Sequence, residues 1–177
     1  IIFSDILMIP YGLNQKVNFK KNFGPELGNI DLKKITNVNE DEFLNKLNPI
    51  YNSIKKVKEN ILTTNKDVIG FIGAPWTLLV YMINKFSPKK NLISDFFKDE
   101  ILIKKILEIL EKFLKIHIEK QIKNGATIIQ IFDSWAGLLE EKDLFNYIYT
   151  PTGNLVNYVK SLNVPVVCFP RGIKNYK

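Results

Sequence analysis

Short runs of apolar residues, separated by longer helical segments, constrain this chain more than any other feature of its sequence. The clearest runs are residues 68–73 (VIGFIG), 127–132 (TIIQIF) and 164–169 (VPVVCF), and residues 1–10 (IIFSDILMIP) resemble them. Because these runs do not alternate with polar residues, we expect strands buried on both faces, as in a parallel sheet covered by helices. The predicted fold class is therefore α/β, with the run at residues 1–10 as a fourth such strand that runs into a loop.

Helical patterns fill the intervals between these runs. Asn39, with Glu42 three residues later, has the spacing of a capping box and predicts a helix over residues 40–60, broken or kinked at Pro49. The longest predicted helix covers residues 100–123 and ends at Gly125. The other predicted elements are a short strand at 15–19, a turn at 20–25, and helices at 77–86, 91–97, 142–147 and 153–162, the last two separated at Thr150–Pro151.

The size of the chain limits the architecture. Four parallel strands suit a doubly wound sheet or part of a (β/α)8 barrel, because a whole barrel needs about 250 residues and this chain has 177. We expect residues 1–177 to form a single domain. The sequence starts with Ile1 rather than Met, so we also expect parts of the protein to be missing from it.

The charge is basic but dispersed. The formal net charge is +7, and the only Arg among the 25 basic residues is Arg171. Nucleic-acid binders concentrate charge and use Arg heavily, so we expect a solvated surface and no nucleic-acid partner. A single cysteine, Cys168, and a single histidine, His117, exclude an internal disulfide and a Cys/His zinc site within the chain. We expect Cys168 to be an inert core thiol and His117 a structural helix residue.

Polar residues follow the predicted strands. In parallel α/β folds, function gathers at the carboxyl ends of strands, and these positions hold Asp5, the segment 73–81, residues 133–135 and Arg171. A carboxylate in surroundings as apolar as those of Asp5 is costly unless it is partnered. From local sequence alone Asp5 could instead cap a helix or fix a loop, the GFIGAPWT segment could be a tight packing turn, and Tyr81 could be a core or rim aromatic.

Five segments together resemble the uroporphyrinogen decarboxylase family. They are FSDILMIP, VNFKKNFGPEL, GFIGAPWTLLVYM, GATIIQIFDSWAG and PVVCFPRG, and they occur in the family's order and approximate spacing. The resemblance implies a partial (β/α)8 barrel containing roughly the second to fifth strands. It also implies decarboxylation of the four acetate side chains of uroporphyrinogen III to give coproporphyrinogen III, without a metal or organic cofactor.

The same resemblance implies the site. Asp5 matches the essential aspartate that meets the pyrrole N–H groups, Tyr81 and Ser134 match substrate-binding hydroxyls, and Phe132 lines the apolar pocket. The full-length protein would be a homodimer with a tetrapyrrole substrate, located in the cytoplasm or alternatively in a plastid, and this fragment would be inactive alone. Two other functions are weighed: a related zinc- and corrinoid-dependent methyltransferase, which needs Cys/His ligands, and a non-catalytic basic binding module. A third hypothesis is that the chain is a truncated, inactive product of a decarboxylase gene.

Overall fold

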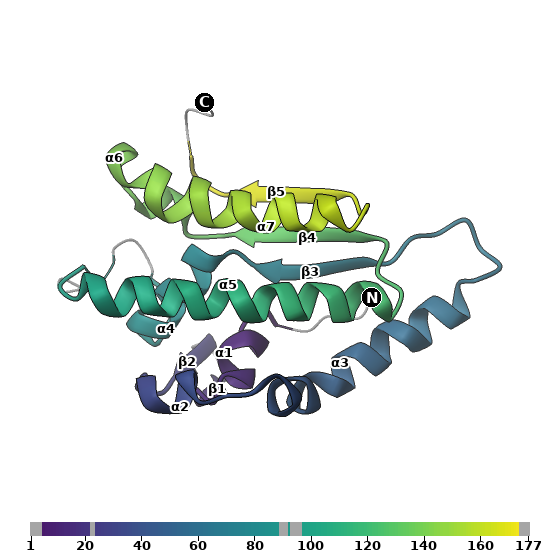
Figure 1. Cartoon of the computed structure of the whole chain (residues 1–177), viewed down its shortest axis with the longest axis horizontal. Coiled ribbons are helices and arrows are strands. Elements are labelled where there is room, and N and C mark those ends of the chain that lie inside the picture. The colour runs from purple at the N-terminus through teal and green to yellow at the C-terminus, as the bar shows by residue number, and fades with distance from the viewer. Residues whose placement is uncertain (1–4, 22–23, 89–91, 93–96, 174–177) are drawn as a thin grey trace.

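A three-stranded parallel sheet forms the frame of the molecule. The computed structural model describes residues 5–21, 24–88, 92 and 97–173. Strands β3 (Ile69–Gly73), β4 (Ile128–Asp133) and β5 (Val166–Pro170) lie in the order β3-β4-β5, and each pairs with its neighbour in parallel. Their carboxyl ends therefore meet at one edge of the sheet, on the left of Figure 1. This confirms the α/β class and three of the four predicted strands.

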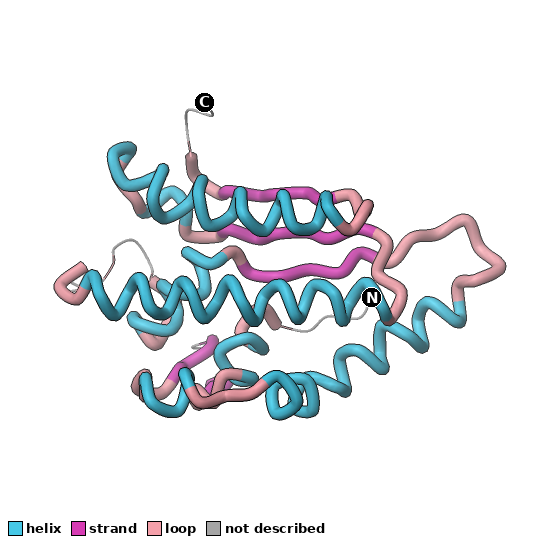
Figure 2. Tube along the Cα trace, viewed as in Figure 1, coloured by secondary structure: helices cyan, strands magenta, loops and turns pink. Residues whose placement is uncertain are grey.

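Two long helices cover one face of the sheet. Figures 1 and 2 show α5 (Glu100–Lys123) and α7 (Thr150–Ser161) lying along that face. The side chains that form this part of the core are wholly buried: Ile106, Leu110, Leu114, Ile129, Ile131, Leu155 and Val159. None of the described helices has the length and apolar character needed to span a membrane.

The opposite face of the sheet is only partly covered. Ile69, Val167 and Phe169 point to that face and are 55%, 50% and 53% exposed. The expectation that the strands are buried on both faces is therefore wrong for this chain. The physical reason is that three strands cannot close a barrel, so the face that a closed barrel would enclose stays open. Cys168 on β5 is exposed as well, which corrects its prediction as a core thiol.

The run at residues 1–10 differs from the predicted strand. Residues 1–4 lie outside the described part of the chain, and residues 5–7 form a turn that leads into helix α1 (Met8–Gly12). Asp5 makes the turn, because its Oδ1 accepts the Leu7 N–H at 2.8 Å and its carbonyl accepts the Met8 N–H at 3.1 Å. Pro10 fits the first turn of a helix, where its missing N–H costs nothing. An apolar run is buried in a strand and in a helix alike, so the apolar pattern alone does not identify the secondary structure here.

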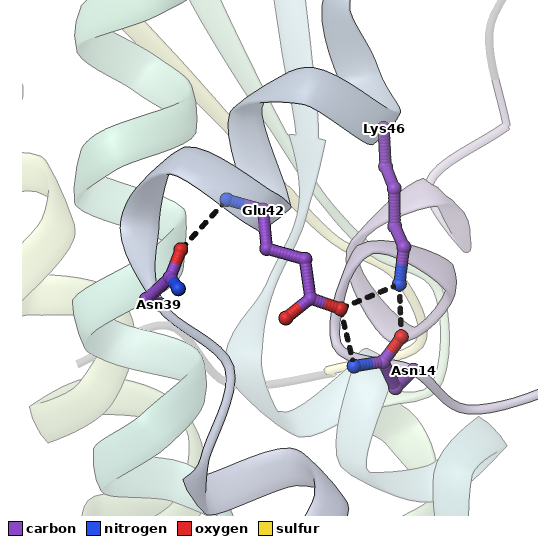
Figure 3. Close-up of polar contacts among 4 residues, drawn as sticks. All are labelled: Asn14, Asn39, Glu42 and Lys46. Carbon is purple, nitrogen blue, oxygen red and sulfur yellow. Dashed lines mark hydrogen bonds and ion pairs between the residues drawn. The ribbon is translucent and has the colours of Figure 1, made fainter.

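Helix α3 (Glu40–Asn60) has the predicted bounds. It begins at Asn39, whose side chain accepts the Glu42 N–H at 2.8 Å. The Glu42 carboxylate, instead of completing a capping box, accepts hydrogen bonds from Asn14 at 2.8 Å and Lys46 at 3.1 Å, and Lys46 also contacts Asn14 (Figure 3). This small network joins the start of α3 to the end of α1.

The helices are continuous at both Pro49 and Thr150–Pro151, where the sequence suggested a break or kink and a separation, respectively. Pro49 lies inside α3 on its exposed side, where water can bind the carbonyl group that the proline leaves unpaired. Residues 141–161 form one helical run: α6 (Glu141–Leu144), a π-helical turn (Phe145–Tyr149), and α7. The π turn directly precedes Thr150–Pro151, so the proline falls where the regular hydrogen-bond ladder is already interrupted. The helix predicted at residues 91–97 falls largely outside the described residues.

The remaining elements complete the lower half of Figure 1. A β-hairpin of β1 (Val17–Lys20) and β2 (Gly24–Leu27) replaces the single strand and turn predicted there, and α2 (Leu32–Thr36) follows it. The Gln15 side chain donates to the carbonyl groups of Gly28 at 2.9 Å and Met82 at 3.0 Å. These bonds attach the hairpin to α4 (Pro75–Asn84).

His117 is a structural residue, as predicted. It is buried on α5, and its Nδ1 lies 2.9 Å from the Tyr51 hydroxyl of α3. Burial lowers the pKa of His117 to about 3, so the imidazole is neutral near neutral pH. The pair therefore joins two helices through an uncharged hydrogen bond in the core.

The cap of α3 gives a stability prediction. We expect Asn39→Ala to lower the free energy of unfolding by about 1 kcal/mol, because the Glu42 N–H loses its partner. Asn45→Ala, on the exposed side of the same helix, is the control and should change it by less than about 0.5 kcal/mol. Urea denaturation followed by circular dichroism measures both variants, and equal effects would contradict the capping role.

Candidate active site

Asp5 lies beside the carboxyl end of β3. Its neighbour Ile6 packs so closely on Gly73, the last residue of β3, that a Cβ on Gly73 would come within 3.1 Å of the Ile6 Cβ. The same Cβ would be 2.9 Å from the Leu78 side chain, so only glycine fits at this position without displacement. The half-buried Asp5 carboxyl is held by the Leu7 N–H. The chain thus delivers an acidic group to the edge of the sheet where function is expected.

Tyr81 lies on α4, the helix that follows β3. Burial raises the pKa of the Tyr81 phenol, a hydrogen bond with the Ser87 side chain lowers it, and the nearby Asp5 carboxylate raises it. The influence of Asp5 places the two groups within electrostatic reach of each other. Tyr81 is therefore a neutral hydrogen-bonding group next to an acid.

The loop after β4 approaches the same place. The rings of Trp135 and Tyr81 lie edge to face with centroids 6.0 Å apart. Ser134, directly before Trp135, is half-buried in this loop. Phe132 points to the opposite face of the sheet from Asp133 and packs edge to face on Phe71 at 5.9 Å. Of the four predicted site residues, the structure brings together Asp5, Tyr81 and the Ser134 loop, and it puts Phe132 on the adjoining open face.

The loops after β4 and β5 are joined through their backbones. The Arg171 N–H donates to the Asp133 carbonyl at 3.0 Å, and the Gly137 N–H donates to the Arg171 carbonyl at 2.9 Å. A Cβ on Gly137 would come within 2.9 Å of the Gly172 backbone, so the close approach needs glycine. The Arg171 side chain is exposed, and its backbone rather than its charge serves this edge.

The comparisons with known proteins decide the family. The family model described as Uroporphyrinogen decarboxylase (URO-D) matches residues 1–176. The chain belongs to the uroporphyrinogen decarboxylase family. A uroporphyrinogen decarboxylase of Campylobacter jejuni is 40% identical over 99% of this chain and 53% of its own length. One from Rickettsia bellii is 36% identical over 97% of this chain and 52% of its own length.

The chain spans about half the length of the curated relatives that it matches. Among solved structures, a methyltransferase from Methanosarcina mazei is similar with a TM-score of 0.70, and the match covers 94% of this chain and 49% of that one. Its sequence is 16% identical to this chain, so the likeness shows the fold alone. Together with the parallel sheet and its helices, the comparisons support the expected partial barrel.

Asp133, within the family's DSWAG-like segment, is the residue that sequence reasoning left without a role. It is 2% exposed, and its Oδ1 accepts a hydrogen bond from the Thr77 hydroxyl of α4 at 2.7 Å. Burial raises the pKa of Asp133 to about 7, while the Thr77 hydrogen bond acts in the opposite direction. Its Oδ2 has no hydrogen-bond partner, and Asp133 is one of the residues that line a cavity of about 330 Å³ beneath α7. In the sequence, the signal for Asp133 is an acidic residue at the end of a largely apolar strand.

No metal cluster accompanies these acids. Within the ranges that the structure describes, no group of three or more His, Cys, Asp or Glu side chains is arranged to hold a metal ion. The functional groups that gather at this edge of the sheet are a carboxyl group, hydroxyl groups and aromatic rings. Such a set can bind N–H groups and carboxylates of an organic substrate.

Asp133 makes the stability of this family member depend on pH. Between pH 4 and 7 the folded protein holds a proton on Asp133 that the unfolded chain has lost, so this residue's contribution to stability falls as the pH rises. We expect the difference in free energy of unfolding between wild type and Asp133→Asn to fall across this range, by at most about 1.4 kcal/mol per pH unit.

Urea denaturation at a series of pH values measures this difference. His117 affects the free energy of unfolding in the opposite direction, because its low folded-state pKa makes stability rise between pH 3 and 6.5. His117 is present in both proteins, so its contribution cancels in the difference. A difference that does not vary between pH 4 and 7 would show that Asp133 is not protonated in the folded state.

Proposed function

We propose that the full-length protein containing this chain decarboxylates the four acetate side chains of uroporphyrinogen III and so produces coproporphyrinogen III, without a cofactor. The observation that carries the proposal is the meeting of Asp5 and Tyr81 at the carboxyl end of β3 in a member of this family. An acidic group beside neutral hydroxyls suits a substrate that offers pyrrole N–H groups at its centre and carboxylates at its rim.

The chemistry explains what the site has to supply. A proton adds to a pyrrole carbon and makes the ring a cation. The bond between the acetate methylene and its carboxylate then breaks, carbon dioxide leaves, and the ring takes up the electron pair. A second proton on the methylene carbon and loss of the first from the ring leave a methyl group. For each acetate, one proton is consumed and one carbon dioxide is released.

Asp5 is proposed to stabilise the cation. As an anion it would accept the pyrrole N–H groups in the ground state and attract the ring more strongly once the ring is positive. At about 4 Å, with an effective dielectric constant near 20, this attraction is on the order of 4 kcal/mol. If it arises mainly in the transition state, the gain is roughly a thousandfold in rate. The turn that holds Asp5 through the Leu7 N–H fixes the carboxyl in advance of binding.

Tyr81 and Ser134 are proposed to bind substrate carboxylates. Both are hydrogen-bond donors that stay neutral, so they orient a carboxylate without neutralising the group that has to leave. Phe132 and its partner Phe71 form an apolar wall on the open face of the sheet, suited to the flat faces of pyrrole rings. The positive net charge of +7 favours encounter with a substrate carrying eight carboxylates.

The proposal also includes the part of the protein outside this chain. Because the chain spans about half the length of its relatives, we expect the remaining half to close the barrel and supply further contacts to the substrate. We expect residues 1–177 to be one part of that single barrel domain, inactive by itself, and the full-length protein to be a homodimer. The curated relatives named above come from bacteria, so the cytoplasm is the proposed location.

The test is an anaerobic assay of the full-length protein with uroporphyrinogen III. We expect Asp5→Asn to lower kcat/KM at least a hundredfold, because the amide cannot attract the ring cation, and Tyr81→Phe to lower it about tenfold. Asn retains the oxygen that accepts the Leu7 N–H, so the turn should be preserved.

Asp67→Asn is the matched control, because Asp67 is an exposed acid just before the opposite end of β3. It should keep wild-type activity. A folded wild-type protein that yields no coproporphyrinogen would refute the proposed function. A fully active Asp5→Asn would refute the role of Asp5 alone.

A further inference from the structure

Three residues of the family's motifs are linked by hydrogen bonds behind the candidate site. The Thr77 hydroxyl donates to Asp133 Oδ1 at 2.7 Å, and the same hydroxyl accepts the Trp135 backbone N–H at 3.2 Å. Thr77 belongs to α4, Asp133 is the last residue of β4, and Trp135 lies in the loop that follows β4. Thr77 and Asp133 are buried, so water competes little for the bond between them.

The directions of the bonds follow from the atoms. A backbone N–H can only donate, so the Thr77 oxygen must accept from Trp135. The single hydroxyl proton is then free for Asp133 Oδ1. Because Asp133 Oδ2 has no hydrogen-bond partner, the only described hydrogen bond to this carboxyl group comes from Thr77. One hydroxyl therefore binds both Oδ1 of the carboxyl group and the loop amide.

This link joins the two segments that carry the proposed substrate hydroxyls. Tyr81 is one helical turn after Thr77 on α4, and Ser134 stands between Asp133 and Trp135. A second bond, from Trp76 Nε1 to the Trp135 carbonyl at 2.9 Å, supports the same alignment. A shift of the loop relative to α4 would therefore change the distance between the Tyr81 and Ser134 hydroxyls.

We propose that Thr77 and Asp133 are positioning residues that hold the Ser134 loop against α4, so that Ser134 and Tyr81 bind substrate carboxylates at a fixed separation. This inference rests on the proposed function and adds two residues that do not themselves touch substrate. Misplacement of a binding group by about 1 Å can cost two orders of magnitude in rate, so such a link is able to matter for catalysis.

The chain contains a close control for this arrangement. At the other end of the same strands, the Thr127 hydroxyl donates to Asp67 Oδ1 at 2.9 Å and accepts the Val68 N–H at 3.3 Å. The partners are again a carboxylate oxygen and a backbone N–H, although this hydroxyl also lies 3.3 Å from the Val68 carbonyl oxygen and its bond to Asp67 is exposed. The location is the edge of the sheet remote from the site. Thr127→Val thus removes the same bonds without reaching the Ser134 loop.

The experiment compares Thr77→Val, Thr77→Ser and Thr127→Val in the full-length protein. We expect Thr77→Val to lower kcat/KM for uroporphyrinogen III at least tenfold, Thr77→Ser to stay within threefold of wild type, and Thr127→Val to stay within twofold. In a Ser134→Ala background, Thr77→Val should lower kcat/KM by less than threefold more, because its effect acts through the loop that carries Ser134.

Amide hydrogen exchange of residues 134–138 gives a readout that does not need substrate. Protection should fall in Thr77→Val and remain in Thr77→Ser. Wild-type activity in Thr77→Val, or effects of Thr77→Val and Ser134→Ala that simply multiply, would overturn the positioning role. If wild type makes no product but the exchange pattern is as expected, the proposed function fails and the link between α4 and the loop stands.

Discussion

The parallel pairing of β3 with β4 is the constraint on which the site depends. Gly73 stands opposite Phe132 in this register, so the chain leaves both strands at the same edge. From there one segment becomes α4 and carries Tyr81, and the other becomes the loop that carries Ser134. The Ala74 N–H still donates to the Phe132 carbonyl at 2.8 Å, which extends the pairing one step beyond β3. Two segments separated by more than fifty residues thus acquire a defined separation before any side chain of the site is considered.

Close packing at the end of β3 then limits which residues can stand there. Gly73 has Ile6 on one side and Leu78 on the other at distances that leave no room for a Cβ. This is why a glycine precedes the start of α4, and it is also what lets the Asp5 turn come up to the strand. The apolar residues around Asp5 serve this packing, since Leu7 and Ile9 are buried in the same core as α4. The acid is held at the boundary of the core without being enclosed by it.

Much of the fold follows from the sequence, and the exceptions have physical causes. The bounds of α3 and α5 are set by local signals, Asn39 and Asp99 at their starts and Gly125 after the second, whose φ of +116° suits glycine. At Pro49 the sequence left a break or a kink open, and α3 is unbroken because the proline lies on a turn of helix that faces water, which is a tertiary property. Helix α1 was missed because an apolar run has the same burial in a strand and in a short helix. Family motifs led to Asp5, Tyr81 and Ser134, whereas the bond between Thr77 and Asp133 spans 56 residues and needed coordinates.

Two acids at this edge of the sheet have different surroundings, and the difference separates their proposed roles. Asp133 is enclosed, and burial raises its pKa to about 7, so near neutral pH a large part of the molecules carry it as a neutral acid. A group of that kind is a poor partner for a developing cation but can belong to a buried hydrogen-bond network, because its neutral form costs much less to bury than a carboxylate would. Asp5 is half-buried and lies at the surface of the core, where a substrate can reach it. The same side-chain chemistry therefore suits structure at one position and electrostatic catalysis at the other, and burial is what distinguishes them.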